Sequence, residues 1–173
     1  MVSVARVFLV PVVVLLLIEG SRASSYVAAA VFAGGALTDG IDGYLARRYA
    51  SITRTGQWLD PLADKLLVSA AVVTLSALDR FPAWAAVLIV VRELGLVGLR
   101  IHAGLHGRAM PASRAAKLKT VLQLAAITLY ILPLGSGADG VRLGVLIAAV
   151  VLTVVTGFDY LQASLRADRA AAR

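Results

Sequence analysis

Length, composition and charge argue against an ordinary soluble domain. The chain has 173 residues, which is room for one domain, and 60% of them are hydrophobic, with a mean hydropathy of +0.85. It has no cysteine, which excludes disulfides and thiolate metal sites, and 17 basic against 10 acidic residues give a net charge of +7. In so apolar a chain a basic excess favours a cytoplasmic membrane surface, so we expect no nucleic-acid partner.

Six apolar segments, each near the length of about 20 residues that crosses a bilayer, follow one another along the chain. They cover residues 3–19, 24–46, 57–78, 82–104, 115–134 and 141–165. The first resembles a signal peptide in length, but no small-x-small cleavage site follows it, so we expect a retained helix. The connections DRFP (79–82) and GSGADG (135–140) favour tight turns between antiparallel helices. The sequence therefore predicts one all-α integral membrane bundle of six transmembrane helices over residues 1–173.

Basic residues are distributed unevenly over the predicted connections. The connections after the second and fourth segments, with the fifth segment's first residues and the C-terminus, hold Arg47, Arg48, Arg54, Arg108, Arg114, Lys117, Lys119, Arg166, Arg169 and Arg173. The other connections hold only Arg22, Arg80 and Arg142. By the positive-inside rule, this asymmetry predicts that both termini are cytoplasmic.

Four aspartates occur in pairs at the junction of the second and third segments. Asp39 and Asp42 are three residues apart, and Asp60 and Asp64 are four apart, so each pair shares one helix face. The predicted topology brings both pairs to the cytoplasmic face. Four close carboxylates repel one another, and bound divalent cations offset that repulsion. Oxygen ligands suit Mg²⁺ or Mn²⁺, and four carboxylates can hold two ions through shared ligands.

A simpler interpretation of the aspartates is structural. They could pair at the membrane surface with nearby cations, of which the sequence offers Arg47, Arg48, Arg54 and Lys65. Paired spacing on two consecutive segments is more than surface ion pairs require. We therefore favour the metal site.

The same stretch resembles a known family motif. DGIDGYLAR (39–47), eight further residues and GQWLDPLAD (56–64) are similar to the signature D-x-x-D-G-x-x-A-R, spacer, G-x-x-x-D-x-x-x-D of the CDP-alcohol phosphatidyltransferases. The resemblance implies a six-helix membrane enzyme, usually a homodimer, with two divalent metals. Such enzymes bind the diphosphate of a CDP-linked lipid and pass its phosphatidyl group to an alcohol, releasing CMP.

The resemblance also implies roles for individual residues. The metal ligands would be Asp39, Asp42, Asp60 and Asp64. Asp64 is in addition the candidate catalytic base, because a carboxylate beside the reacting phosphate can accept the proton of the attacking hydroxyl. The residues against the CDP-lipid would be Gly43, Ala46, Arg47 and Gly56.

The second half of the chain bears on the acceptor alcohol. VVRELGLVGLR (90–100) and SRAAKLKTVLQ (113–123) are similar to stretches of the bacterial phosphatidylglycerophosphate synthases, with Ala116 in place of a glycine. That resemblance implies CDP-diacylglycerol and sn-glycerol 3-phosphate as substrates. The cations expected to bind the acceptor's phosphate are Arg92, Arg100, Lys117 and Lys119. Arg92 stands beside Glu93 inside an apolar run, where an ion pair indicates function, whereas Lys119 and Arg114 could simply anchor the chain.

Four alternatives stay open at this point. Cardiolipin synthase and phosphatidylinositol phosphate synthase share the motif but use other acceptors. An intramembrane prenyltransferase also surrounds Mg²⁺ and a diphosphate with aspartates, but resembles longer bundles of about nine spans. A cation transporter would hold its carboxylates near the bilayer midplane. We expect a multi-pass enzyme of the bacterial cell membrane whose active site faces the cytoplasm.

Overall fold

Six helices account for almost all of the structure. The computed structural model describes the backbone of residues 2–49, 56–105 and 114–171, and the side chains of residues 7–36, 65–99, 116–158 and 160–162. Over these residues the elements are α1 (Val2–Glu19), α2 (Arg22–Tyr49), α3 (Gly56–Ala77), α4 (Ala83–Leu105), α5 (Arg114–Ile131), the 3-10 helix η1 (Ser136–Ala138) and α6 (Asp139–Ala171), with no strand. Each predicted apolar segment falls on one α-helix, so the all-α prediction is confirmed. Of the basic residues in the topology prediction, Arg54, Arg108 and Arg173 lie outside the described residues.

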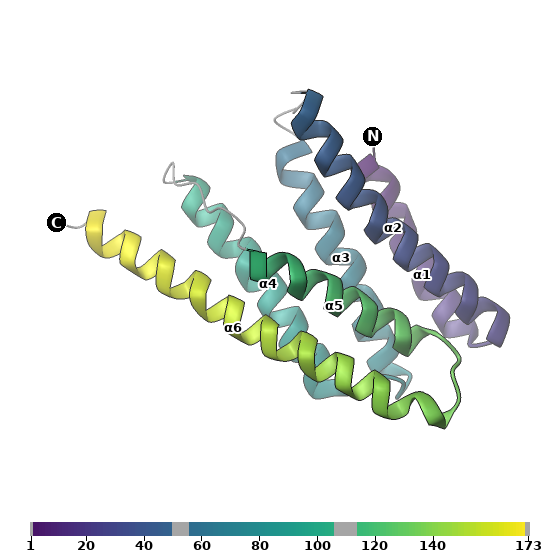
Figure 1. Cartoon of the computed structure of the whole chain (residues 1–173). Helices are drawn as coiled ribbons and strands as arrows, with labels where there is room; N and C mark the ends of the chain where they lie inside the picture. Colours follow the sequence, from purple (N-terminus) through teal and green to yellow (C-terminus); the bar gives the residue numbers. More distant parts are fainter. Residues whose placement is uncertain (1, 50–55, 106–113, 172–173) are drawn as a thin grey trace.

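The helices run alternately in opposite directions. In Figure 1, α1, α3 and α5 run toward the lower right, and α2, α4 and α6 run toward the upper left. One end of the bundle therefore holds the last residues of α2, α4 and α6 and the first residues of α1, α3 and α5. We call it the motif end, because residues 39–49 and 56–64 meet there, and we call the opposite end the turn end.

Buried apolar side chains from all six helices form one core. Helix α1 packs on α2 and α3, α3 packs on α4 and α5, and α6 packs on α4 and α5. The core is made of small and aliphatic residues, with Leu17, Phe32, Leu75, Ile89 and Ile127 among its fully buried side chains. Close packing of this kind holds helices together even where lipid replaces water around them.

Large apolar side chains also cover the outside of the bundle. Phe8 is 68% exposed, and Leu15 and Val91 are each 66% exposed. Soluble monomers rarely expose so much apolar surface, whereas lipid tails would cover it, so the surface has membrane character. Within the described residues, only Ser136–Gln162 is both long and apolar enough to cross a bilayer by itself, and Val7–Glu19 and Lys65–Ala77 are shorter apolar helices. Six separate membrane spans therefore stay a prediction.

The connection between α3 and α4 is a tight turn, as its sequence predicts. Asp79 has a positive φ of 54°, the left-handed conformation that commonly ends a helix. The Arg80 N–H donates to the Leu75 carbonyl at 2.9 Å, and the Asp79 N–H donates to Ser76 at 3.1 Å. These two bonds satisfy carbonyls that the end of α3 leaves open, and they send the chain directly back into α4.

Two arginines of the turn end cap the C-terminus of α5. Arg142 donates to three carbonyl oxygens, at 3.0 Å to Leu129, 2.7 Å to Leu132 and 3.2 Å to Leu134. Arg80 donates to the Ile131 carbonyl at 2.9 Å. The last carbonyls of a helix have no partner within it, and a cation there also complements the helix dipole. Two of the three basic residues of this end thus have a structural role.

Replacing Arg142 with glutamine is expected to lower the unfolding free energy by about 2 kcal/mol, because charge-assisted hydrogen bonds to several carbonyls are lost together. The change should appear as a lower Tm when helicity is followed by circular dichroism in detergent micelles. Arg22→Gln makes the same chemical change at an exposed arginine of the same end and should leave Tm nearly unchanged. Equal Tm values for the two variants would contradict the capping role.

Candidate active site

The first aspartate pair continues the buried stripe of α2. Ala28, Phe32 and Gly35 are buried and stand on one face at intervals of four and three residues. Asp39 and Asp42 extend this series at the next intervals of four and three. Because a helix repeats every 3.6 residues, both positions lie on the stripe that faces the bundle interior.

The second pair continues the buried stripe of α3 in the same way. Val68, Ala71 and Leu75 are buried, and Asp60 and Asp64 precede them on that stripe at intervals of four residues. Asp60 and Asp64 lie about 6 and 12 Å along the axis from the start of α3, and Asp39 and Asp42 about 15 and 10 Å from the end of α2. The two antiparallel helices therefore bring all four positions to similar depths at the motif end.

Close packing supports the two helices directly beside these positions. A Cβ added at Gly35, one turn before Asp39, would lie 3.0 Å from Leu9 Cδ1 and 3.5 Å from Leu67 Cδ2. Leu67 in turn follows Asp64 by three residues. A side chain at position 35 would crowd Leu9 of α1 and require it to shift, so this glycine allows α1 and α2 to pack closely.

The donor set at the motif end fits hard divalent cations. Four carboxylates on two interior stripes supply oxygen ligands of the kind that Mg²⁺ and Mn²⁺ prefer. The side chains of these aspartates lie outside the described ones, as do those of Ala46 and Arg47. Among the side chains that the structure does describe, no group of three or more His, Asp or Glu could hold a metal. The fit therefore rests on register and on ligand chemistry.

A buried polar cluster lies inside the bundle next to the second aspartate pair. Glu93 of α4 is fully buried, and its Oε1 accepts hydrogen bonds from Lys119 Nζ of α5 and, at 3.1 Å, from Arg92 Nη1. Lys65 Nζ of α3 lies 2.5 Å from the other oxygen, Oε2. Arg92 Nη2 also donates to Thr156 Oγ1 of α6 at 3.1 Å. We call these five residues the polar hub; they join four helices.

The predicted acceptor residues divide between the polar hub and other places. Arg92 and Lys119 come together on Glu93, and Lys119 is 1% exposed, so it is not a surface anchor. Lys117 is exposed, on the face of α5 opposite Lys119. Arg100 lies on α4 two turns beyond Glu93 toward the motif end, and its side chain is outside the described ones. The structure thus brings together two of the four.

Comparison with known proteins decides the family. The sequence model of the CDP-alcohol phosphatidyltransferases matches residues 1–155. This range includes both aspartate pairs and every residue of the polar hub except Thr156. The chain belongs to the CDP-alcohol phosphatidyltransferase family. This membership confirms the family resemblance of the aspartate motif, and it makes the chain a transferase.

The chain aligns with several bacterial relatives over most of its length. It is 42% identical over 167 residues, 95% of this chain and 79% of the relative, to a probable phosphatidylglycerophosphate synthase of Mycobacterium tuberculosis. It is 38% identical over 165 residues, 93% of each chain, to a CDP-diacylglycerol–glycerol-3-phosphate 3-phosphatidyltransferase of Rickettsia typhi. A Bacillus subtilis protein of the same name is 33% identical over 174 residues, 92% of this chain and 90% of the relative.

The sequence predicts the ion pair of Arg92 and Glu93, but it does not predict the other two cations that contact Glu93. Its spacing relates Lys65 to the aspartates and Lys119 to a phosphate or the membrane surface, so neither is predicted to contact Glu93. One signal was available: Glu93 is the only acidic residue in the apolar segment 82–104, so buried cations of neighbouring helices had few other partners. One turn beyond Lys119, the buried Gln123 has an Oε1 with no hydrogen-bond partner among the described residues.

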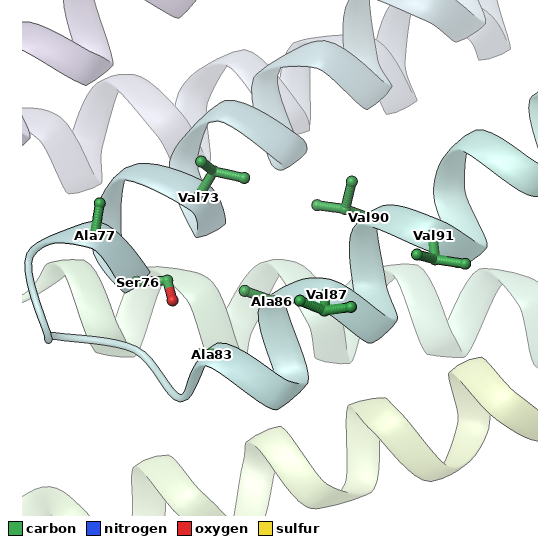
Figure 2. Close-up of a pocket in the computed structure, with 8 residues that line it drawn as sticks. All are labelled: Val73, Ser76, Ala77, Ala83, Ala86, Val87, Val90 and Val91. Carbon is green, nitrogen blue, oxygen red and sulfur yellow. The ribbon is translucent and has the colours of Figure 1, made fainter.

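Two grooves of this phosphatidyltransferase-family bundle are lined almost entirely by apolar residues. Figure 2 shows one of about 360 Å³ between the end of α3 and the start of α4. It is lined by Val73, Ser76, Ala77, Ala83, Ala86, Val87, Val90 and Val91. A second, of about 640 Å³, lies between α1 and α3 and shares Val73. Neither is lined by a charged residue, so neither competes with the motif end as the site of chemistry.

Proposed function

We propose that the protein transfers the phosphatidyl group of CDP-diacylglycerol to sn-glycerol 3-phosphate, giving phosphatidylglycerophosphate and CMP. The observation that carries this proposal is the register of the two aspartate pairs, which continue the interior stripes of α2 and α3 at one end of the bundle. Family membership supports the reaction class. The names of relatives that align over more than 90% of the chain support the acceptor.

The aspartates and their neighbours are proposed to bind different parts of the donor, the CDP-lipid. Two divalent cations held by the four carboxylates would offset the charge of the diphosphate and stabilise the departing CMP. Gly43 leaves room on α2 for the cytidine diphosphate to approach the backbone, and Arg47, one turn later, supplies a cation for a phosphate oxygen. Ala46 and Gly56 complete the CDP-lipid contact.

Asp64 is the proposed catalytic base. Its position follows Asp60 by one turn on the interior stripe of α3 and directly precedes Lys65 of the polar hub, which supports this role. As the acceptor oxygen bonds to the phosphorus, the phosphorus–oxygen bond to CMP breaks, and a carboxylate oxygen of Asp64 takes the hydroxyl proton. An alcohol has a high pKa, so removing its proton during attack lowers the barrier.

The acceptor phosphate is proposed to bind cations on α4 and α5. Arg92 and Lys119 lie in the polar hub, where three cations share one carboxylate and leave a formal surplus of two positive charges. A phosphate monoester dianion carries two negative charges. Arg100 and Lys117, nearer the motif end, are proposed to guide it in.

Arg92→Ala is expected to raise KM for glycerol 3-phosphate by about tenfold or more, because a charged contact to the phosphate is lost. KM for CDP-diacylglycerol should stay within about twofold, since α2 and α3 form the donor side. Lys117→Ala should act in the same direction. Arg22→Ala, at the turn end, is the control for a general loss of positive charge. Equal increases for both substrates would contradict an acceptor site.

The proposed setting is the bacterial cell membrane, crossed six times, with both termini and the motif end in the cytoplasm. Alternation of the helices supports it, because the motif end shares its side with both described chain ends (Figure 1). At the turn end, Arg80 and Arg142 serve α5 as caps, so the remaining basic excess lies at the motif end, as the positive-inside rule requires. The protein is proposed to act as a homodimer, as the family resemblance implies.

One assay tests the proposed function. Purified protein receives CDP-diacylglycerol and Mg²⁺ together with glycerol 3-phosphate, inositol phosphate or phosphatidylglycerol in separate reactions, and CMP release is measured. Phosphatidylglycerophosphate formed only with glycerol 3-phosphate is the expected result. Product with phosphatidylglycerol would indicate a cardiolipin synthase, product with inositol phosphate a phosphatidylinositol phosphate synthase, and no CMP with any acceptor would contradict the reaction class.

A further inference from the structure

The polar hub connects the two sides of the proposed reaction through one side chain. Glu93 on α4 uses both of its oxygens: Oε1 holds Lys119 of α5 and Arg92, and Oε2 holds Lys65 of α3. Lys119 is a proposed acceptor cation, and Lys65 directly follows Asp64, the proposed base. A single carboxylate therefore lies between the phosphate-binding cations and the helix that carries the base.

Burial restricts the positions that these charged side chains can adopt. Glu93 is fully buried and Lys119 is 1% exposed, whereas Lys65 and Arg92 retain 17% and 13% exposure. Without the carboxylate, three cations would share a water-poor interior and repel one another. With it, their ammonium and guanidinium groups have fixed places, so an arriving anion meets a preformed charge pattern.

The Lys65 contact also determines how α3 is turned. Successive residues of an α-helix are about 100° apart around its axis, so directing Lys65 toward α4 fixes the direction of the position before it. That position is Asp64, and Asp60 lies about 40° further round. Release of Lys65 from Glu93 would remove a restraint on the stripe that carries both aspartates.

We infer that Glu93 is a positioning residue: it holds Lys119 and Arg92 for the acceptor's phosphate and, through Lys65, holds α3 so that Asp64 faces that acceptor. The inference rests on the proposed function. It assigns Glu93 no contact with substrate. It requires that loss of the carboxylate weaken use of the acceptor more than use of the CDP-lipid, even when net charge is kept.

A charge-balanced pair of substitutions tests this role. Lys65→Met combined with Glu93→Gln removes one positive and one negative charge, and it leaves all four proposed acceptor cations in place. KM for glycerol 3-phosphate is expected to rise about tenfold or more, with KM for CDP-diacylglycerol within about twofold. Glu93→Asp keeps the charge but is one methylene shorter, so it should give an intermediate increase in the same KM.

Arg142→Gln serves as the control for lost stability. It is expected to lower Tm by removing the α5 cap at the other end of the bundle, without changing the polar hub. That variant should keep both KM values. If the charge-balanced variant, or Glu93→Asp, lowers Tm but keeps the wild-type KM for glycerol 3-phosphate, or raises both KM values equally, Glu93 is a structural residue and the inference is overturned. Failure of the wild-type protein to use glycerol 3-phosphate would instead overturn the proposed function.

Discussion

Asp64→Asn is expected to lower kcat by about 10² to 10⁴, the usual loss on removing a general base, while CDP-diacylglycerol and metal affinities stay within a few-fold. The amide keeps an oxygen that can face a cation, but it cannot take a proton from the acceptor hydroxyl. Added Mg²⁺ should therefore not restore the rate. The measurement is kcat and lipid-nucleotide affinity across a Mg²⁺ titration.

A matched control for this change exists in the same protein. Asp79→Asn makes the same substitution at an exposed aspartate of the turn end, where asparagine also tolerates the positive φ. It should retain wild-type turnover. If high Mg²⁺ restores Asp64→Asn, the residue is chiefly a metal ligand, and another group must accept the proton.

Activity is expected to require a divalent cation and to disappear in excess EDTA, because four carboxylates on neighbouring helices need positive charge between them. Asp39→Ala, Asp42→Ala and Asp60→Ala should each abolish turnover, while the protein still inserts and keeps its helicity. The milder Asn variants should bind metal more weakly and be partly rescued by more Mg²⁺ or Mn²⁺. Rescue by metal thus separates these three positions from Asp64.

The metal prediction is checked by titrating Mg²⁺ and Mn²⁺ into EDTA-treated protein and measuring both CMP release and metal affinity. Asp79→Ala reports the effect of losing a carboxylate outside the motif end. Full activity in excess EDTA would refute the metal site, and so would metal affinities that are equal in wild-type protein and in Asp39→Asn.

Helix positions and the aspartate motif could be predicted from the sequence, because both depend on local spacing. Apolar runs between turn residues mark the helices, and intervals of three and four residues place Asp39 with Asp42 and Asp60 with Asp64 on helix faces. That each pair continues the buried stripe of its helix required the structure. The structure was also needed to show which helix faces point outward, such as those that carry the exposed Phe8 and Val91.

The polar hub could be predicted only in part, because its contacts are tertiary. Arg92 and Glu93 are neighbours in sequence, so their ion pair was predicted, and the structure confirms it at 3.1 Å. Lys65 and Lys119 lie 28 and 26 residues from Glu93, and no local pattern relates the rotation of α3 and α5 to that of α4. The cap that Arg142 forms on α5 was missed for the same reason, since it depends on how the α5–α6 connection folds back.

The polar hub also bears on how such a protein is made. Helices enter a bilayer during synthesis in the order of the chain, and a lysine near the centre of a lone helix opposes entry by about 2.5 to 3.5 kcal/mol. In the proposed six-span topology, Lys65 on α3 precedes its partner Glu93 on α4, and Glu93 precedes Lys119 on α5. If α3, α4 and α5 each cross the membrane, as proposed, Lys65 and Lys119 therefore gain their shared carboxylate only once all three helices are present, and α6 then adds the Thr156 contact to Arg92.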